Sequence, residues 1–411
     1  MKNDQRRIPI HTERMMNDLD TMRGFGACGT GVVRPAFSEV DIRSRGWLVE
    51  RMEAAGLEVH VDEIGNVFGL PPGDGPCFLV GSHSDTQPEG GWLDGVYGVV
   101  AGLEIARASL EAGGPRIACV SFQDEEGRFT PLTGSRVWTG RLAPETADAL
   151  ADSAGVTLAE ARRNRDGLPP ASAVSPDRFS GFLEIHIEQG PVLDIAGERI
   201  GVVESIVGIR SQRMSFVGEQ NHAGTTPMAM RRDAFQALVA FTAEIGRRFA
   251  GMIGPATVWT IGQVALHPNA TSIVPGRADF WLQWRDGDDA LLDRMRDVID
   301  ATAGEVARDR GLSWSKSDYS QIAATRSDPA LVEALAGAAE QLAPGAWRRM
   351  PSGALHDAAN ASTRMPMAML FLPSIGGRSH CFDEDTRRED LVLGAEVLAA
   401  AIGTFLAPPA R

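Results

Sequence analysis

The sequence predicts an α/β fold, in which a mixed, mostly parallel sheet is covered by helices and a smaller α+β domain is inserted into the larger one. In the first half of the 411-residue chain, short apolar strands alternate with helical segments, which is typical of a parallel sheet. From about residue 209 the pattern changes, and it returns after about residue 320. We therefore expect one domain over residues 1–208 and 321–411 and an inserted domain over residues 209–320.

The elements of the larger domain follow from periodicity and from the positions of glycine. Helical periodicity ends at a glycine in residues 39–56, and a glycine-asparagine pair favours a hairpin in residues 57–70. We further expect buried strands at 77–85 and 117–122, an apolar helix at 96–114, surface helices within 142–178, a strand at 181–190 paired with one at 199–208, a helix at 329–342, a loop at 350–362, a strand at 367–372 and a helix at 389–404.

The inserted domain is expected to be a β-α-β-β-α unit. Its strands and helices are predicted at residues 211–219, 231–250, 256–266, 278–286 and 288–310, in that order. No internal repeat interrupts either domain.

Bulk composition limits the classes of function. The net charge of −14 argues against a nucleic acid or an anionic membrane as partner, but it allows a small anionic substrate. The four cysteines are far apart and form no disulfide framework, which fits a reducing compartment. Apolar runs are too short to span a membrane, and the polar start of the chain has no signal-peptide pattern, so we expect a cytoplasmic protein.

Two candidate metal ligands lie near the end of the first buried strand. His83 follows the apolar run of residues 78–81, and we expect the Asp85 side chain to accept its second ring N–H, as metal-bound histidines require. Asp94 lies on a glycine-flanked loop, where its two oxygens can reach two cations. Each residue alone also has a structural interpretation, His83 as a loop histidine and Asp94 as a helix N-cap.

Four more residues complete the set. Glu125 and Glu126 follow the next strand, where adjacent acids repel one another unless a cation is near; we interpret Glu126 as a ligand and Glu125 as the general base. A solvated acidic turn is the alternative. His186 is flanked by acids on a strand, and His380 lies in a glycine-rich loop. Together these side chains match the needs of a two-metal hydrolase of amide-like bonds.

The chain resembles a known family through the motifs GSHSDTQPEGGWLDGVYGV, DEEGRF, HIEQGPVL, VGEQNHAGTTPM, PNATSIVPG, MPSGALHDA and PSIGGRSH. They resemble the dinuclear zinc amidohydrolases related to aminoacylases and aminopeptidases, and within them the N-carbamoyl-L-amino-acid hydrolases, allantoate amidohydrolases and beta-ureidopropionases. The resemblance implies a catalytic domain and an inserted lid domain that forms a homodimer. It also implies that His83, Asp94 and His186 bind one zinc ion and that Asp94, Glu126 and His380 bind the other.

The implied activity is hydrolysis of the C–N bond of an N-carbamoyl-L-amino acid, which releases the amino acid, CO2 and ammonia. Allantoate or ureidoglycolate hydrolysis, and N-acyl-amino-acid or dipeptide hydrolysis, remain alternatives. So does a non-catalytic dimeric binding protein that keeps the same fold. Histidine and carboxylate ligands also accept Mn²⁺, Co²⁺ or Ni²⁺, so the sequence predicts two divalent cations without fixing the metal.

The same resemblance identifies candidate substrate residues. Arg285 is implied to hold the substrate carboxylate, which suits its planar guanidinium group. His222 is implied to polarise the scissile carbonyl through a contact made across the dimer interface. Gln189 and Asn269 are implied polar contacts to the ureido group and the carboxylate. His356 is a further candidate near the carboxylate, with a hydrogen bond to Asp357 or a loop carbonyl as the structural alternative.

Four positions depart from the family pattern. They are Ser272, where an asparagine is usual, Gln283 in place of an aspartate, Leu355 in place of a glycine, and Arg378 in place of a small or apolar residue. None of them is a predicted metal ligand. They therefore affect the identity of the substrate rather than the chemistry, and Arg378 adds a cation that would favour a second substrate carboxylate or a bulkier anionic acyl group.

Overall fold

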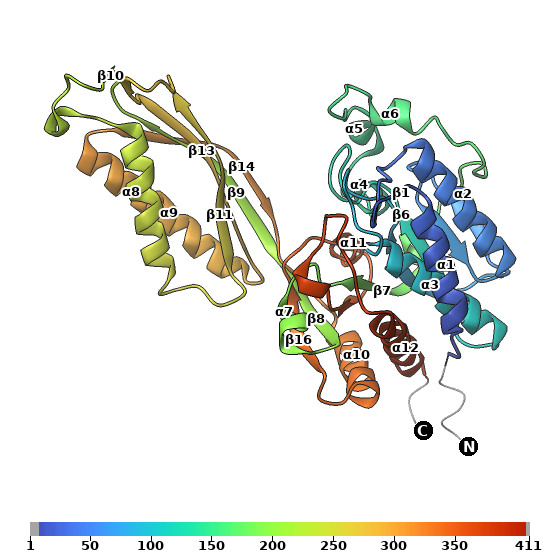
Figure 1. Cartoon of the computed structure of the whole chain (residues 1–411). Coiled ribbons are helices and arrows are strands. Elements are labelled where there is room, and N and C mark those ends of the chain that lie inside the picture. Colours follow the sequence, from blue (N-terminus) through green and yellow to red (C-terminus); the bar gives the residue numbers. More distant parts are fainter. Residues whose placement is uncertain (1–7, 408–411) are drawn as a thin grey trace. The chain divides into compact units, whose positions relative to one another are not determined.

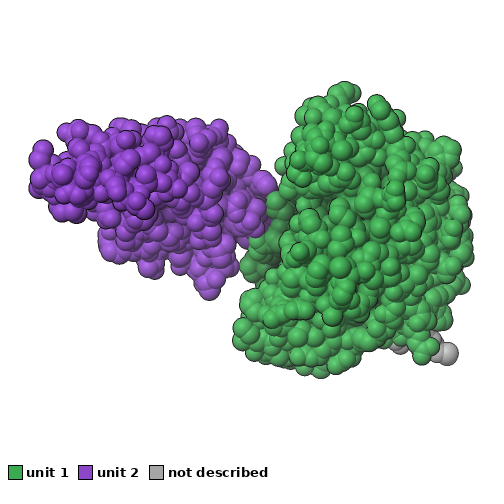
Figure 2. Space-filling model, turned by 45° about the horizontal axis from the view of Figure 1, so that its top comes forward, with its two compact units in different colours: residues 1–204, 326–411 green, residues 205–325 purple. Residues whose placement is uncertain are grey.

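A computed structural model describes residues 8–407 of the chain. The chain divides into two compact units, coloured separately in Figure 2: unit 1 comprises Met1–Glu204 and Arg326–Arg411, and unit 2 comprises Ser205–Thr325. The start of the chain, on which the expectation of a cytoplasmic protein partly depends, includes residues 1–7, which lie outside the described residues. Within residues 8–407, no helix is long and apolar enough to cross a membrane.

A mixed nine-stranded sheet, counted over the described residues, forms the centre of unit 1 (Figure 1) and confirms the predicted α/β class. Its central strands β6, β5, β7 and β17 are parallel, and antiparallel strands flank them. The order across the sheet is β15 (Thr325–Arg326), β8 (Ile200–Ile206), β17 (Met367–Leu372), β7 (Phe179–Ile187), β5 (Cys77–His83), β6 (Ile117–Phe122), β4 (Val67–Leu70) and β3 (Glu58–Val61), with β16 (Trp347–Ser352) also paired to β8.

Helices cover this sheet. Helix α3 packs on the parallel strands with α1 against it, and α12 packs on β17 and β7 with α10 against it. The helices of unit 1 are α1 (Thr12–Gly24), α2 (Glu39–Ala54), α3 (Val96–Glu111), α4 (Thr133–Trp138), α5 (Pro144–Asp148), α6 (Leu158–Ala161), α7 (Val192–Ala196), α10 (Pro329–Leu342), α11 (Asp357–Ala361) and α12 (Arg388–Phe405). Two 3₁₀ turns, η2 (Pro176–Arg178) and η4 (Ile375–Gly377), and a small hairpin of β1 (Ala27–Cys28) and β2 (Gly31–Val32) complete it.

Unit 2 is a four-stranded antiparallel sheet with two long helices on one face (Figure 1). The apolar sides of both helices and alternate residues of the strands form a separate core. Its elements are β9 (Gly208–Val217), β10 (Asn221–His222), η3 (Met228–Met230), α8 (Ala234–Phe249), β11 (Val258–His267), β12 (Ile273–Val274), β13 (Arg277–Asp286), α9 (Asp289–Arg310) and β14 (Ser313–Ile322).

Several details differ from the sequence expectations. Strand β8 does not pair with β7, because β17 lies between them. Strand β14 was not predicted, since it is a polar edge strand whose residues are nearly all exposed and lack the alternation of a half-buried strand. The expected loop at 350–362 contains the short helix α11, and the expected surface helices within 142–178 are limited to α5 and α6.

Candidate metal centre

The candidate metal ligands converge because they follow neighbouring parallel strands. His83 is the last residue of β5 and lies opposite Phe122, the last residue of β6, so Glu125 and Glu126 emerge beside it. His186 lies near the end of β7, and His380 follows β17, the next strand across the sheet. Parallel strands present their carboxyl ends at one edge of a sheet, which is where such sites form.

Two overlapping groups of ligand atoms result, both sharing Asp94. In the first group, Asp94 Oδ1 lies 3.0 Å from His186 Nε2 and 3.4 Å from His83 Nε2. In the second group, His380 Nε2 lies 3.3 Å from Asp94 Oδ2 and 3.5 Å from Glu126 Oε2. Each carboxylate oxygen of Asp94 thus belongs to a different group, which is the arrangement a bridging carboxylate needs.

The backbone fixes the tautomer of two imidazoles. His83 Nδ1 lies 3.1 Å from the carbonyl oxygen of Asp85, and His186 Nδ1 lies 2.8 Å from that of Ile187. A carbonyl accepts only, so each neutral ring carries its proton on Nδ1 and presents the lone pair of Nε2 to the site. The rings are therefore oriented as metal-binding histidines are.

The role expected for the Asp85 side chain was wrong. Its Oδ1 lies 3.7 Å from His83 Nδ1, further than its own backbone carbonyl. The carboxylate instead accepts the backbone N–H groups of Glu125, at 3.3 Å, and Glu126, at 3.2 Å. Asp85 thus fixes the turn from which both glutamates project.

The two adjacent glutamates face different neighbours. Glu125 Oε2 lies 3.5 Å from His83 Nε2, whereas Glu126 Oε2 lies near His380 and accepts a hydrogen bond from Gln87 Nε2 at 2.7 Å. Burial, together with the negative charges of Glu126, Asp357 and Asp94, raises the pKa of Glu125 well above its usual value. A carboxylate with a raised pKa and no place in either ligand group has the properties of a proton acceptor.

In the absence of cations, the ionisable groups of the site shift one another's pKa values. Burial and the nearby Asp94 raise the pKa of Glu126 to about 7. The hydrogen bond with Asp94 raises the pKa of His380 to about 9. Burial opposes the charged form of His83, but Glu125, Asp94 and Asp85 outweigh it and raise its pKa. Such mutual perturbation is typical of groups arranged to hold a cation.

The loop before α3 approaches the site so closely that it requires glycine. Gly95 has a φ of +66°, and a Cβ added there would lie 2.4 Å from His83 Nε2. Its backbone N–H donates to His186 Nε2 at 3.0 Å. A side chain at this position would displace the His83 ring, because real Cβ contacts are never that short.

Gln189 contacts two members of the second ligand group. Its Nε2 donates to Asp94 Oδ2 at 2.7 Å and lies 3.1 Å from His380 Nε2. Its Oε1 is buried and has no hydrogen-bond partner among the described residues. The backbone of Gln189 has a φ of +58°, and its N–H donates to Ser374 Oγ at 3.0 Å. An unsatisfied amide oxygen beside these ligands is a group that a substrate N–H can satisfy.

His356 lies behind the first ligand group. It is buried, its ring packs edge-on against His186 with centroids 4.7 Å apart, and its Nε2 lies 3.0 Å from Ser352 Oγ. Burial and the neighbouring His186 lower the pKa of His356 well below its usual value. The hydrogen-bond partner is therefore Ser352, not Asp357 or a loop carbonyl.

The other candidate substrate residues belong to unit 2. His222 is exposed, and its Nδ1 accepts the backbone N–H groups of Gly224, at 3.0 Å, and Thr225, at 3.1 Å. Its neutral ring thus carries the proton on Nε2, which is a donor. Asn269 is exposed, with a φ of +58°. Arg285 lies near the end of β13.

The departures from the family pattern have defined environments. Gln283 Oε1 accepts from Arg285 Nη2 at 2.8 Å and from its Nε at 3.0 Å, so it orients that guanidinium group. The carbonyl of Ser272 accepts the N–H of Ala223, beside His222. Arg378 pairs with Asp383 at 2.5 Å, and Leu355 is partly exposed.

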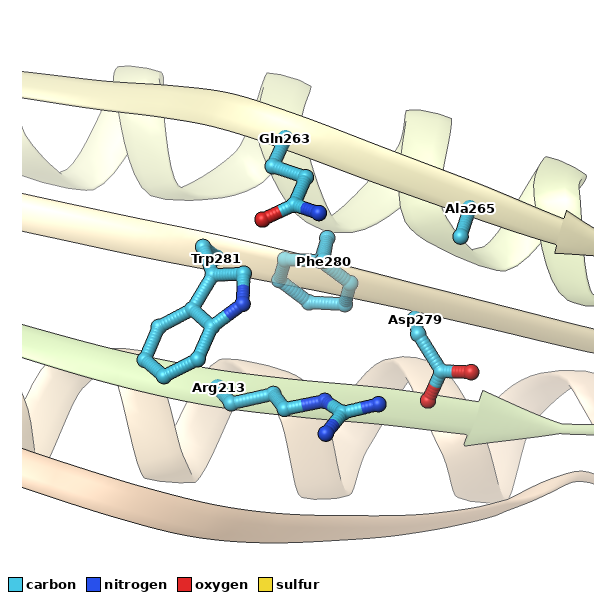
Figure 3. A pocket seen from close by; sticks show the side chains of 6 residues that line it. All are labelled: Arg213, Gln263, Ala265, Asp279, Phe280 and Trp281. Carbon is cyan, nitrogen blue, oxygen red and sulfur yellow. The ribbon is translucent and has the colours of Figure 1, made fainter. Parts of the chain in front are cut away.

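One cavity adjoins the second ligand group, and another lies in unit 2. One, of about 300 Å³, lies beside Glu126 and is lined by Gln87, Arg128 and Asp152 among others. The other, of about 180 Å³, is a hollow on the open face of the unit 2 sheet. Figure 3 shows Arg213 and Trp281 rising from that face, with the helices behind the strands.

Comparisons with known proteins identify relatives of this chain. Residues 79–404 match the model of Peptidase family M20/M25/M40. The N-carbamoyl-L-amino-acid amidohydrolase of Paenarthrobacter aurescens is 36% identical over 94% of this chain and 96% of its own length. The allantoate amidohydrolase of Escherichia coli is 33% identical over 92% and 94%. A crystal structure of an amidase of the hydantoinase/carbamoylase family from Burkholderia phymatum superposes with a TM-score of 0.89, at 42% identity over 96% of this chain and 98% of that one.

Proposed function

This chain belongs to Peptidase family M20/M25/M40, and from that premise we propose that it is a metal-dependent amidohydrolase of N-carbamoyl-L-amino acids. The observation that carries the proposal is the convergence of His83, Asp94, His186, Glu126 and His380 around one shared carboxylate. The names of several relatives support the ureido substrate class. One water and one substrate would yield the free amino acid, CO2 and ammonia.

Two divalent cations suit these residues. Three imidazoles and two carboxylates direct donor atoms into two groups, and two of the imidazoles have Nδ1 held by backbone carbonyls. Zn²⁺ prefers this donor set, and Mn²⁺, Co²⁺ and Ni²⁺ also accept it. When bound, the cations would act as Lewis acids and lower the pKa of water at the site.

The side chains then have separate tasks. Glu125 accepts a proton from the attacking water and returns it to the leaving nitrogen. His222 donates its Nε2–H to the oxygen on which negative charge develops. Arg285, held by Gln283, binds the substrate carboxylate. Gln189 offers its amide to the ureido group; Asn269 and His356 are further proposed polar contacts to the substrate.

A homodimer is part of this proposal, because one copy of unit 2 does not bring its substrate residues together. Arg285 and Arg277 are at opposite ends of β13, eight residues apart, so roughly 26 Å separates them. His222 pairs with Ile273, just before the Arg277 end. The scissile carbon and the carboxylate carbon of the substrate are separated by only three covalent bonds, or roughly 4 Å. His222 and Arg285 must therefore come from different copies if both contact one substrate.

Mixed dimers test this arrangement. Co-expression of Glu125→Gln and His222→Ala chains gives heterodimers in which one site combines an intact Glu125 with an intact His222 from the partner. If His222 acts across the interface, random assortment restores about a quarter of the normal activity. If it acts within its own chain, the mixture stays as inactive as either variant alone.

The substrate is tested by a hydrolysis panel with ammonia detection after reconstitution with Zn²⁺ or Mn²⁺. We expect N-carbamoyl-L-amino acids to have the highest kcat/KM. Faster release of ammonia from allantoate would favour the activity named for the Escherichia coli relative. Activity only on N-acetyl-amino acids or dipeptides would contradict the ureido assignment. The net charge of −14 supports a small-molecule substrate rather than a nucleic acid, and a cytoplasmic location stays a prediction.

A further inference from the structure

A buried carboxylate outside both ligand groups joins the two loops that carry the central ligands. Glu384 is 1% exposed. Its Oε1 accepts the backbone N–H groups of Leu93, at 3.1 Å, and Asp94, at 3.0 Å. Its Oε2 accepts the hydroxyl of Ser379 at 2.8 Å, and the same hydroxyl lies 3.1 Å from Asp94 Oδ2. Glu384 thus contacts the backbone of Asp94 directly and approaches its side chain through Ser379.

The Asp94 loop is shaped around this carboxylate. A Cβ added to Gly91 would lie 1.8 Å from Glu384 Oε1, so only glycine leaves room for it. A side chain at residue 91 would therefore displace the Glu384 carboxylate from the Asp94 loop.

The other end of the contact is also anchored. Around Glu384, the N–H of Ile375 donates to the carbonyl of Asp385 at 2.9 Å, and Thr386 Oγ1 donates to the carbonyl of Pro373 at 2.8 Å. These bonds close the loop that carries His380 immediately after β17. The position of Glu384 is therefore set by the sheet, and its carboxylate transmits that position to the Asp94 loop.

We propose that Glu384 is a positioning residue that holds the Asp94 loop against the His380 loop and so keeps the two halves of the metal site at the correct separation. The inference rests on the proposed function, since it concerns the cations assigned there. Burying a carboxylate is costly unless strong hydrogen bonds compensate, and the two backbone N–H groups and the hydroxyl provide them. An outer partner of this kind commonly changes metal affinity 10- to 100-fold when it is removed.

The test compares metal affinity in Glu384→Ala, Glu384→Gln and Ser379→Ala, using chelator-treated full-length protein titrated with Zn²⁺. We expect Glu384→Ala to lower the affinity of the weaker site about 10- to 100-fold, and Ser379→Ala about 10-fold. Glu384→Gln keeps an oxygen for both backbone N–H groups, and its amide can donate to Ser379, so it should stay within a few fold of the normal protein. Activity lost in Glu384→Ala should return at high Zn²⁺ concentration.

Glu104→Gln provides a matched control for general destabilisation. Glu104 is also a buried carboxylate of unit 1, but it lies on α3 and pairs with Arg14 and Arg107. Its replacement should lower the melting temperature without changing Zn²⁺ affinity.

Three outcomes would overturn the inference: unchanged affinity in both Glu384→Ala and Ser379→Ala, equal losses in Glu384→Ala and Glu384→Gln, or an equal loss in the Glu104 control. If Glu384→Ala does not fold, Ser379→Ala and Glu384→Gln decide the question. Failure of the proposed function is distinguishable, because the normal protein would then bind no Zn²⁺ in the same titration.

Discussion

Replacing Glu125 with glutamine removes the proposed proton acceptor while keeping nearly the same shape. Glu125 is the acidic side chain that approaches His83, at 3.5 Å, yet belongs to neither ligand group. Its backbone N–H is held by Asp85 and would remain so in the variant. The substitution should therefore leave both ligand groups in place and affect only proton transfer.

The expected loss follows from the role of a general base. Such a group contributes about 100- to 10,000-fold to the rate, which corresponds to a barrier higher by about 3–5 kcal/mol. We expect kcat to fall by this amount, whereas KM and the metal content stay near normal. The assay is ammonia release at saturating Zn²⁺, with metal content measured by mass spectrometry on the same sample.

Glu126→Gln is the matched control, because the two residues are adjacent and only Glu126 lies in a ligand group. It should lose metal, and added Zn²⁺ should restore part of its activity. Excess Zn²⁺ should not restore Glu125→Gln. Normal turnover in Glu125→Gln with full metal content would refute the reasoning, and so would a loss of metal equal to that of Glu126→Gln.

Three further predictions concern the same site. Gly95→Ala should bind less metal than the normal protein while keeping its far-ultraviolet circular dichroism, because the added methyl group collides with His83; full metal content would contradict this. Zn²⁺ affinity should rise with pH and level off above about pH 9, because the cation must displace the proton of His380, whose pKa is raised to about 9 by Asp94. Calorimetry in buffers of different ionisation enthalpy measures the protons released on binding. Binding at pH 7 without proton release would contradict the prediction. Arg285→Lys should raise KM at least about 10-fold with a smaller change in kcat, because a lysine cannot reproduce the two-point contact with a carboxylate; an unchanged KM would remove Arg285 from the substrate site.

The class of fold was predictable because it depends on strong local patterns. The strands that end at His83 and Phe122 are short apolar runs, and both are fully buried in the sheet. Helix α10 occupies the predicted residues 329–342. Strand order was less accessible, since periodicity defines a strand but not its neighbour, and β17 separates β7 from β8 for reasons of packing.

The residues that support the site were harder to predict than the candidate ligands. Histidines and acids at strand ends can be chosen as candidate ligands from the sequence, because those groups bind metals. Glu384 lies in the stretch DEDT, which has the composition of a solvated turn, and only the fold brings it to the backbone of Asp94. Asp85 was noticed, but sequence spacing did not indicate that its carboxylate accepts the N–H groups of Glu125 and Glu126.

The distribution of these residues separates the chemistry from the choice of substrate. Every candidate metal ligand, and Glu125, lies in unit 1, whereas Arg285 and the departure that contacts it, Gln283, lie in unit 2. A neutral amide orients the guanidinium group here, where the family pattern has a carboxylate. If Arg285 binds the substrate carboxylate as proposed, substitutions at Gln283 would change that binding and leave the candidate metal ligands of unit 1 unchanged. The relatives named for N-carbamoyl-amino acids, allantoate and ureidoglycolate are consistent with this proposed division, in which one metal centre would serve substrates that differ in the groups bound by residues of unit 2.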